Sequence, residues 1–540
     1  MGASPDHTFA QRLEDLVASR PDACALIDRG QRLSFRQLQD QVQALAAGLA
    51  GAGMRPGDRV ALWLPNCTAW VVSFLACARL GAVVLAVNTR FRSAEVADIL
   101  GRGKADWLLF WPTFKGIDFP AILDEVPSAS TARLRGLVAW TEPGEPLAPA
   151  WRGHRQHAFR LLAAGGGAAP AAQPNAGVLC FTTSGTTSLP KFVLHDQRTL
   201  LLHGDAVGHA AGYGDGSCVL ASAPFCGAFG FATLAGALAG GVPLALEPVF
   251  SAVSSVQAIR RYGITHTYAN NEALMHILQA ASPGDLASAR LFGFASFAPD
   301  SGQLFALADA AGLPLAGLYG SSELQALLAV QPADASQGDV TLRRQPGGVL
   351  VHPRALVRAR DPQTGALLPH GQSGEIEIRS PSLMLGYLDQ PEETRKALTH
   401  DGYFRTGDLG YTVSVRQFVF QARMGDSLRL AGFLVNPAEI ESVVAALPGV
   451  RACQVVGANR HGKTVPFAFV LLEPGSDADE QAWHAACRTR MAGFKVPAGF
   501  AVLDRFPSVQ SANSVKIQKN KLRELADAIL RDASSPAPDP

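Results

Sequence analysis

The stretch from Val178 to Lys191 constrains this chain more than any other segment. Its first four residues, Val178 to Phe181, are apolar and predict a short buried strand. Hydroxyl residues surround Gly185 directly after that strand, and Pro190 and Lys191 close the segment. Glycine permits backbone angles that turn successive N–H groups toward an anion, hydroxyls add neutral donors, and the lysine adds a positive charge. The pattern therefore predicts a phosphate-binding loop after a strand.

A Walker A loop does not fit this segment. No Gly-Lys-Ser/Thr ends it, so a kinase or a motor ATPase is disfavoured. A Ser/Thr-rich surface turn is the other interpretation of the same composition. The loop by itself leaves both interpretations open.

The whole chain has the composition of an ordinary globular protein. Its 540 residues are 48% hydrophobic and carry a formal charge of +1, a length that allows about two to four domains. The neutral balance gives no support for a general nucleic-acid binder, which needs a basic face. The eight cysteines form no CxxC pair or His-Cys cluster, and the N-terminus lacks a signal-peptide pattern. We therefore expect a cytoplasmic protein with neither a disulfide framework nor a zinc site.

One uncharged segment raises the question of a membrane span. No charged residue occurs between Gly216 and Leu246, but prolines and glycines interrupt the segment repeatedly. This favours short buried elements joined by turns over a span, which needs an uninterrupted apolar helix.

The N-terminal two-thirds predict an α/β fold with a helix-covered, largely parallel sheet. Ser34 and Gln37 form a capping box that opens a helix. Strands and helices are then predicted in alternation, at residues 59–64, 68–80, 83–87, 93–100, 107–110, 256–262, 264–268 and 272–280. That alternation is typical of parallel sheets. Residues 142–177, rich in Pro, Gly and Ala, are interpreted as a surface connection.

The pattern changes after Gln421 to short alternating strands and a few helices. A large domain over residues 1–423 and a smaller, mobile α+β domain over residues 424–532 explain this change. Residues 533–540 are expected to be a disordered tail.

The loop at Thr183–Lys191, read as Thr-Ser-Gly-Thr-Thr-x-x-Pro-Lys, resembles the phosphate loop of the adenylate-forming (AMP-binding) superfamily. That superfamily includes acyl- and aryl-CoA synthetases, peptide-synthetase adenylation domains and beetle luciferases. Ser188 and Phe192 stand where the family usually or often has glycine. Further family motifs follow in the family's order as far as Lys519. The N-terminal third, notably Leu80-Gly81-Ala82-Val83 and Asn88-Thr89-Arg90-Phe91, resembles the family's first subdomain, so the resemblance covers nearly the whole chain.

The second motif is Tyr319-Gly320-Ser321-Ser322-Glu323, which follows an apolar run and resembles the family's Tyr-Gly-x-Thr-Glu. Strand ends of open α/β sheets are where ligands bind. Tyr319 is expected to stack on the purine, Ser322 to donate to phosphate and Glu323 to hold Mg²⁺. A helix start, with Glu323 complementing the dipole, is the alternative.

The third motif surrounds Asp408, in Tyr-Phe-Arg-Thr-Gly-Asp-Leu-Gly, and nearly matches the family's ribose motif. An ionised Asp408 can accept hydrogen bonds from both ribose hydroxyls, although a Gly-Asp turn between strands has the same spacing. Arg423, Gly425 and Gly432 resemble the family's hinge region, in which Arg423 contacts ribose or phosphate. A plain interdomain linker is the alternative there.

The last motif resembles the family's C-terminal lysine loop, with Val515 in place of the usual glycine and Lys516 as the candidate catalytic lysine. A solvated basic face is the other interpretation, because further basic residues lie close by. Because the other family motifs precede this loop in the family's order, a catalytic role for Lys516 is favoured.

The resemblance implies an ATP-dependent acyl-CoA synthetase that forms acyl-AMP and transfers the acyl group to CoA. The implied catalytic residues are Lys516, Glu323 and Lys191, and the implied metal ligands are Glu323 and Thr186. The implied ATP-binding residues are Thr183, Ser184, Gly185, Thr186, Thr187, Ser188, Lys191, Tyr319, Gly320, Ser321, Ser322, Glu323, Asp408, Arg423 and Lys516. Acyl contacts are expected from Phe225, Gly227, Phe229 and Asn270, and CoA contacts from Gly432 and Lys495.

The implied co-substrates and cofactor are ATP, CoA and Mg²⁺, and the implied substrate is a fatty or other aliphatic or aryl acid. No Asp stands in the segment Pro224–Gly230, where relatives that activate amino acids place one, so amino-acid activation is disfavoured. A ligase that loads an acyl carrier protein and a non-catalytic acyl-nucleotide-binding paralogue stay open as alternatives. A homodimer is compatible with the sequence.

Overall fold

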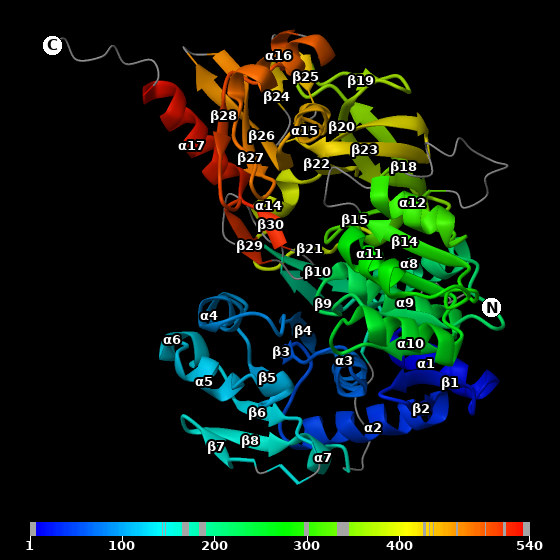
Figure 1. Cartoon of the computed structure of the whole chain (residues 1–540). Coiled ribbons are helices and arrows are strands. Elements are labelled where there is room, and N and C mark those ends of the chain that lie inside the picture. Colours follow the sequence, from blue (N-terminus) through cyan, green and yellow to red (C-terminus); the bar gives the residue numbers. More distant parts are fainter. Residues whose placement is uncertain are drawn as a thin grey trace.

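The structure is a computed structural model. It describes residues 7–142, 144–145, 147–164, 172–182, 191–295, 302–331, 345–424, 428–430, 433–435, 437–460, 463–491, 493–510 and 515–532. The N-terminal part lies at one end, the small C-terminal domain at the other, and the parallel half of a large sheet between them (Figure 1).

The first sheet contains nine strands within the described residues, in the order β21-β10-β9-β4-β3-β5-β6-β8-β7. The strands from β9 to β8 in this order are parallel, and both ends of the sheet are antiparallel. Its strands are β3 Arg59–Trp63, β4 Val83–Ala86, β5 Trp107–Phe110, β6 Gly136–Ala139, β7 Ala150–Trp151, β8 His154–Ala158, β9 Gly177–Thr182, β10 Phe192–Asp196 and β21 Gly386–Tyr387.

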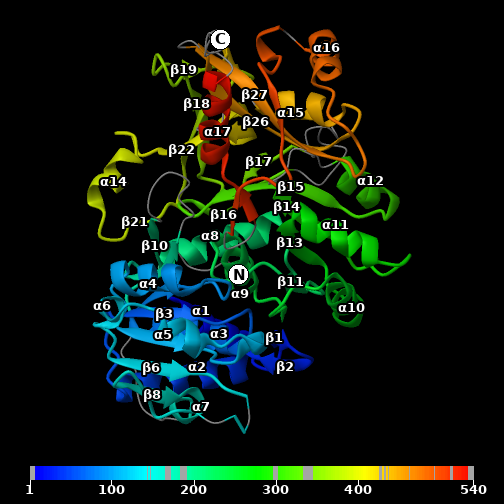
Figure 2. The same cartoon turned by 60° about the vertical axis from the view of Figure 1, so that its left-hand side comes forward.

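Helices before and between these strands cover the sheet. Ser34 accepts a hydrogen bond from the Gln37 N–H at the start of α2, the predicted capping box. Most of α3 is buried, because it lies between the two large sheets (Figure 2). The helices of this part are α1 Phe9–Ser19, α2 Phe35–Gly51, α3 Thr68–Leu80, α4 Ser93–Arg102, η1 Phe114–Gly116, α5 Phe119–Asp124, α6 Ser128–Thr131 and α7 Phe159–Leu162.

The second sheet contains fourteen strands within the described residues, in the order β19-β18-β20-β22-β23-β17-β16-β15-β14-β13-β11-β12-β1-β2. The strands from β15 to β1 in this order are parallel, and the remainder is antiparallel. Its strands are β1 Cys24–Asp28, β2 Gln31–Ser34, β11 Val219–Ala221, β12 Leu244–Leu246, β13 His266–Asn270, β14 Leu291–Ala295, β15 Leu315–Ser321, β16 Gln325–Val330, β17 Gly347–Leu350, β18 Leu356–Arg360, β19 Leu367–Leu368, β20 Gly374–Arg379, β22 Phe404–Ser414 and β23 Gln417–Arg423.

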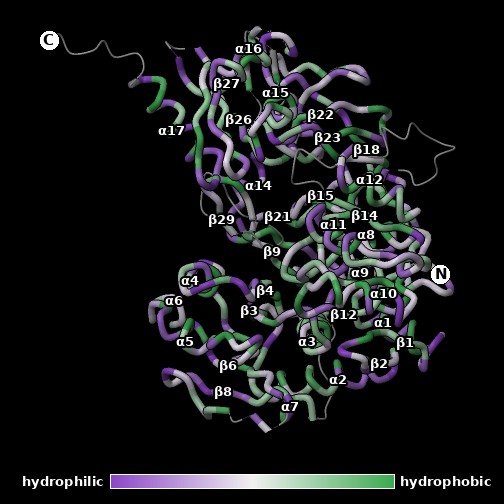
Figure 3. The backbone as a smooth tube through the Cα atoms, viewed as in Figure 1, coloured by the Kyte–Doolittle hydropathy of each residue, from purple (hydrophilic) through white to green (hydrophobic). Residues whose placement is uncertain are grey.

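Helices α8 and α9 pack closely beside this sheet. A Cβ atom at Gly204 of α8 would lie 2.5 Å from the carbonyl oxygen of Ala235 in α9, so the close approach of the two helices needs glycine at that point. Helix α9 carries no charged residue, and its backbone tube in Figure 3 lacks the deep purple that marks hydrophilic residues. The helices of this part are α8 Gln197–Ala210, α9 Ala228–Gly240, α10 Ala252–Tyr262, α11 Asn271–Ala280, α12 Gly302–Ala310 and α14 Pro391–Lys396.

The small domain follows β23, which ends at Arg423 as the last strand of the large sheet along the chain. A long hairpin of β26 and β27 carries β28 in parallel on its edge. Buried residues of this hairpin and of α15–α17 form its two clusters of apolar side chains. The elements are β24 Leu428–Leu430, β25 Phe433–Val435, α15 Pro437–Ala445, β26 Val450–Arg460, β27 Lys463–Leu472, α16 Glu480–Arg490, η2 Gly493–Lys495, β28 Phe500–Val502, β29 Ser508–Gln510, β30 Val515–Ile517 and α17 Lys519–Asp532.

The predicted fold class is confirmed, since a large domain with parallel, helix-covered sheets is followed by a smaller mixed domain. The uncharged segment 216–246 forms β11, α9 and β12, as short buried elements. None of the helices in the described parts of the chain reaches the length and apolarity that crossing a bilayer requires. The expected surface connection at 142–177 is wrong in part: β7, β8 and α7 form within it, and β8 pairs with β6.

Candidate active site

The first cluster of the site joins Tyr319, Asp408 and Arg423. Tyr319 lies in β15, and its hydroxyl donates to Oδ2 of Asp408 at 2.5 Å. Nη1 of Arg423 donates to Oδ1 of the same carboxylate at 2.7 Å. The pairing of β22 with β23 places Asp408 directly opposite Arg423, which explains the contact. Both carboxylate oxygens therefore already accept a hydrogen bond, and each keeps a lone pair for a further donor.

Burial dominates the electrostatics of this cluster. Asp408 is only 5% exposed, and its desolvation raises the pKa of the carboxyl group although Arg423 acts against the rise. Asp408 in turn raises the pKa of Arg423, with a smaller contribution from the charge of Glu323. Tyr319 is also buried, with its ring 4.9 Å from that of Phe418. Stacking of Tyr319 on a purine stays a prediction.

The second cluster joins Lys191, Glu323 and Tyr387. The Tyr387 hydroxyl donates to Oε1 of Glu323 at 2.9 Å. The Lys191 ammonium lies 4.5 Å from the centre of the Tyr387 ring and 3.1 Å from Oε2 of Glu393. The antiparallel pairing of β21 with β10 brings Tyr387 opposite Val193, and so close to Lys191. One tyrosine therefore contacts two of the three predicted catalytic residues.

Two buried histidines flank the turn that carries Glu323. Nε2 of His195 lies 2.7 Å from the carbonyl oxygen of Ser322, and Nε2 of His203 lies 2.7 Å from that of Ala326. Burial lowers the pKa of each histidine to about 4, so both are neutral near pH 7 and each donates through Nε2. Gln325 and Leu327, in the same stretch, have positive φ angles of 65° and 61°. Such strain in non-glycine residues concentrates at functional sites.

The predicted acyl-binding residues serve the packing of the large domain in this structure. Phe225 is buried, with its ring 5.1 Å from that of Trp70, and Phe229 is buried in α9. Gly227 is the N-cap of α9. Asn270 is the N-cap of α11, where Oδ1 accepts from the Ala273 N–H at 2.8 Å. Contacts of these residues with an acyl group stay a prediction.

Several predicted residues lie outside the described part of the chain. These are Thr183, Ser184, Gly185, Thr186, Thr187 and Ser188 of the phosphate loop, the hinge residue Gly425, the CoA-contact residue Gly432 and the tail 533–540. The structure describes the backbone of Lys516 in β30, opposite Val509, but not its side chain. The β29–β30 hairpin extends from the small domain toward the large one (Figures 1 and 2). Lys495 ends η2 in the small domain.

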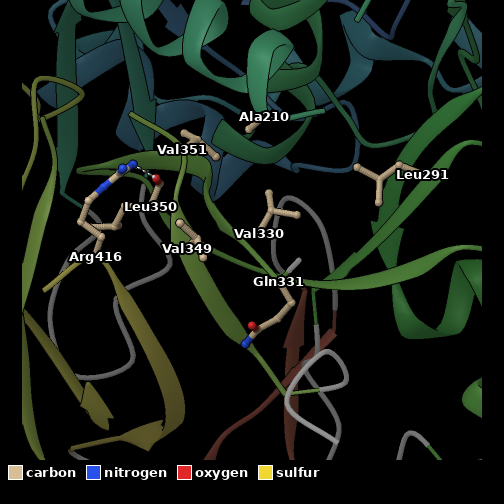
Figure 4. Close-up of a pocket in the computed structure, with 8 residues that line it drawn as sticks. All are labelled: Ala210, Leu291, Val330, Gln331, Val349, Leu350, Val351 and Arg416. Atoms are coloured by element: carbon tan, nitrogen blue, oxygen red, sulfur yellow. Dashed lines mark hydrogen bonds between the residues drawn. The ribbon is translucent and has the colours of Figure 1, made fainter. Parts of the chain in front are cut away.

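A cavity of about 290 Å³ lies beside β16 and β17. Leu291, on its wall, begins β14, whereas Glu323 follows the opposite, carboxyl end of β15. Arg416 donates to the carbonyl oxygen of Leu350 at its edge (Figure 4). None of the predicted site residues lines this cavity, whose wall comprises Ala210, Leu291, Val330, Gln331, Val349, Leu350, Val351 and Arg416.

Comparison with protein families decides the affiliation of the chain. The model of the AMP-binding enzyme family matches residues 13–388, and that of the AMP-binding enzyme C-terminal domain matches residues 439–513. The chain belongs to the AMP-binding enzyme family. The resemblance seen in the sequence motifs is therefore confirmed.

Relatives with assigned activities match this AMP-binding enzyme along almost its whole length. A methyl-dioxo-octahydroindenyl-propanoyl:CoA ligase of Mycobacterium tuberculosis is 30% identical over 533 residues, which cover 96% of this chain and 99% of the relative. The sulfoacetate–CoA ligase of Cupriavidus necator is 28% identical, covering 95% and 97%. The fatty acid–acyl-carrier-protein ligase of Streptomyces coeruleorubidus is 28% identical, covering 96% of each chain.

Solved structures share the fold. ATP-bound MatB from Rhodopseudomonas palustris superposes with a TM-score of 0.82 at 23% identity, covering 96% of this chain and 99% of that one. The anthranilate CoA ligase AuaEII in complex with anthranoyl-AMP gives a TM-score of 0.81 at 24% identity, covering 98% and 99%.

The donor set at Glu323 fits a magnesium ion. Glu323 is a half-buried carboxylate at the carboxyl end of β15, and its Oε1 is engaged by Tyr387. Magnesium is commonly held by one or two carboxylates together with phosphate oxygens and water. Glu323 would hold the ion, and the ion would supply charge neutralisation at the phosphates.

Sequence reasoning missed Tyr387 and Glu393. Tyr387 belongs to a two-residue strand whose pairing with β10 spans almost two hundred positions of the chain. A strand of that length has no periodic signal. The short Gly-Tyr ahead of a Pro-Glu-Glu helix start at residues 391–393 was the one available hint.

Proposed function

We propose that this AMP-binding enzyme is an ATP-dependent acyl-CoA synthetase, an acid–thiol ligase of the AMP-forming type. The observation that carries the proposal is the pair of side-chain clusters in the large domain. Lys191 and Glu323 both contact Tyr387, Asp408 binds Tyr319 and Arg423, and the charge of Glu323 acts on Arg423. The named relatives, which are mostly CoA ligases, support the same activity. ATP, CoA and a carboxylic acid are the substrates.

The reaction has two half-reactions. In the first, a carboxylate oxygen attacks the α-phosphorus of ATP, the bond to the β-phosphate oxygen breaks, and pyrophosphate leaves. In the second, the CoA thiol loses its proton and attacks the acyl carbon, and AMP leaves with the oxygen that bridged it to the acyl group. Acid and ATP are both anionic, so catalysis of the first step consists mainly of placement and charge neutralisation.

The residues of this chain have separate tasks in the first step. Lys191 and Lys516 bring positive charge to the phosphates and the carboxylate, and Asp408 accepts hydrogen bonds from the ribose hydroxyls. Arg423 lies beside Asp408 with its side chain 60% exposed, where it meets the ribose or a phosphate. We propose that the small domain then rotates about residues 423–425 and carries Lys516 away before the thiol attacks.

We propose an aliphatic or aryl acid as the substrate and the thiol of CoA as the acceptor. The match to the carrier-protein ligase of Streptomyces coeruleorubidus favours phosphopantetheine on a carrier protein as the second candidate acceptor. A reducing cytoplasm is the proposed compartment, in line with cysteines that form no CxxC pair. A homodimer stays a prediction.

The experiment is an activity screen with a panel of aliphatic, aryl and sulfonated acids. Purified enzyme is supplied with ATP, Mg²⁺ and each acid, with CoA, phosphopantetheinylated carrier protein or no acceptor. AMP and acyl-CoA that appear only with both acid and CoA support the proposal. Acyl transfer to the carrier alone supports the second candidate, and the absence of acid-dependent pyrophosphate release with every acid identifies a non-catalytic paralogue.

A further inference from the structure

Tyr387 is placed to act on two charged groups at once. Its hydroxyl donates to Oε1 of Glu323, and the Lys191 ammonium lies over its ring. The two contacts use different parts of the side chain, since one needs the hydroxyl and the other needs the aromatic face. Removing the hydroxyl alone therefore separates them.

The surroundings hold Tyr387 in this position. Its backbone N–H donates to Oγ1 of Thr394 at 2.9 Å, and β21 pairs with β10. Burial raises the pKa of Tyr387, and the negative charge of Glu323 adds to the rise. The strand pairing and the hydrogen bond to Thr394 fix the backbone from which the hydroxyl reaches Glu323.

The hydroxyl selects one oxygen of Glu323. Tyr387 is held by the pairing of β21 with β10, and its hydroxyl donates to Oε1 of Glu323. The remaining lone pairs of the carboxylate are then available to a cation. A carboxylate fixed in one rotamer loses less conformational entropy when it binds a cation than a free one.

The ring restrains Lys191 from the other side. Glu393 also contacts the Lys191 ammonium and accepts from Lys396 at 2.9 Å through its other oxygen. A triphosphate competes with Glu393 for this ammonium because both are anions. The neutral ring does not compete, so it stays under the ammonium while the phosphates arrive.

We propose that Tyr387 is a positioning residue that orients Glu323 toward the metal ion through its hydroxyl and Lys191 toward the phosphates through its ring. This inference rests on the proposed function. The inference goes beyond the proposed function because it assigns two separable tasks to a residue outside the phosphate, ribose and lysine motifs.

The test compares Tyr387→Phe with Tyr387→Leu. Tyr387→Phe removes only the hydroxyl, so the Mg²⁺ concentration for half-maximal acid-dependent pyrophosphate exchange should rise about 3- to 10-fold, the effect of losing one typical net hydrogen bond. The KM for ATP at saturating Mg²⁺ should stay within about 2-fold, since the contact with Lys191 persists. Tyr387→Leu should raise both quantities. Tyr262→Phe, a tyrosine on α10 that contacts Arg261, is the matched control.

A binding measurement accompanies the kinetics. Mn²⁺ serves as the probe, and its affinity for the enzyme with a non-hydrolysable ATP analogue is measured by electron paramagnetic resonance. Tyr387→Phe should weaken Mn²⁺ binding about 3- to 10-fold. In a Glu323→Gln background the same change should have no further effect, because the hydroxyl then has no carboxylate to orient.

Each outcome bears on the inference. The inference is overturned if Tyr387→Phe and Tyr387→Leu raise the half-maximal Mg²⁺ concentration and the KM for ATP equally. It is also overturned if Tyr387→Phe weakens Mn²⁺ binding as much in the Glu323→Gln background as in wild type, and Tyr387 is then a packing residue. If wild-type enzyme shows no acid-dependent exchange with any acid, the proposed function fails instead. The Mn²⁺ arm then still decides whether Tyr387 orients Glu323.

Discussion

Asp408 offers the sharpest test of how the nucleotide is held. We predict that Asp408→Asn weakens the use of ATP and removes the preference for ATP over 2′-deoxy-ATP. The carboxylate is 5% exposed and already accepts from Arg423 and the Tyr319 hydroxyl. Its remaining lone pairs are what a ribose hydroxyl can use.

The size of the effect on kcat/KM follows from the hydrogen bonds that Asp408 already accepts from Arg423 and Tyr319. A hydrogen bond to a charged group contributes about 1.5–3 kcal/mol, and the lower end applies because Arg423 already neutralises part of the charge. For wild-type enzyme, kcat/KM should therefore be about 10-fold higher with ATP than with 2′-deoxy-ATP. In Asp408→Asn, kcat/KM for ATP should fall at least about 10-fold, mainly through KM, and the ratio between the nucleotides should approach one.

The asparagine variant is preferred to alanine because the buried Tyr319 hydroxyl keeps a polar partner. Alanine would leave that hydroxyl without its acceptor, at a cost of about 1–3 kcal/mol in folding free energy. Circular dichroism checks the fold, and Asp361→Asn, in the turn between β18 and β19, controls for the loss of an acidic group elsewhere. If Asp408→Asn keeps the wild-type ratio between ATP and 2′-deoxy-ATP, Asp408 does not hold the ribose.

Further variants and one pH profile test the remaining assignments. Glu323→Gln should slow adenylation about 100-fold, with partial recovery at raised Mg²⁺; kinetics unchanged at low Mg²⁺ would remove Glu323 from the metal site. Gly227→Trp should shift the preference among acids toward shorter chains, because the added ring fills space that a long acyl chain needs. An unchanged chain-length preference would mean that the acyl group lies elsewhere. Lys516→Ala should lose about 10²- to 10³-fold in pyrophosphate exchange yet convert supplied acyl-AMP and CoA to acyl-CoA at a similar rate, whereas equal loss of both would contradict a role in one half-reaction. Burial raises the pKa of Asp408, so lowering the pH through the pKa of this group neutralises the carboxylate and should raise the KM for ATP. A KM for ATP that does not change at acid pH in wild type, or that rises in the same way in Asp408→Asn, would contradict this.

The local motifs could be predicted from the sequence because each combines a strand end with a few functional residues. The strand before the phosphate loop, the capping box at Ser34 and the alternation of β3, α3 and β4 all form as expected. The signals there are short-range, since hydrophobic periodicity and helix caps depend on residues a few positions apart.

The contacts between motifs could not be predicted in the same way. Tyr319 and Asp408 are separated by 89 positions, and the Lys191–Glu393 contact spans 202. The first depends on the series of antiparallel pairings that links β15 to β22 through β16, β17 and β23, and the second depends on the pairing of β10 with the two-residue strand β21. No local pattern encodes these pairings. The antiparallel strands β16–β20 were also missed between the second and third motifs, because short strands in a sheet of mixed direction give weak alternation.

The central claim is that the acid is activated as acyl-AMP, and oxygen labelling tests it most directly. The enzyme is supplied with an accepted acid labelled with ¹⁸O in both carboxylate oxygens, together with ATP, Mg²⁺ and CoA, and the products are analysed by mass spectrometry. Because the attacking oxygen becomes the bridge to the α-phosphorus and leaves with AMP, one ¹⁸O should appear in AMP and the other in acyl-CoA. Unlabelled AMP, or label recovered in phosphate beside ADP, would contradict the account.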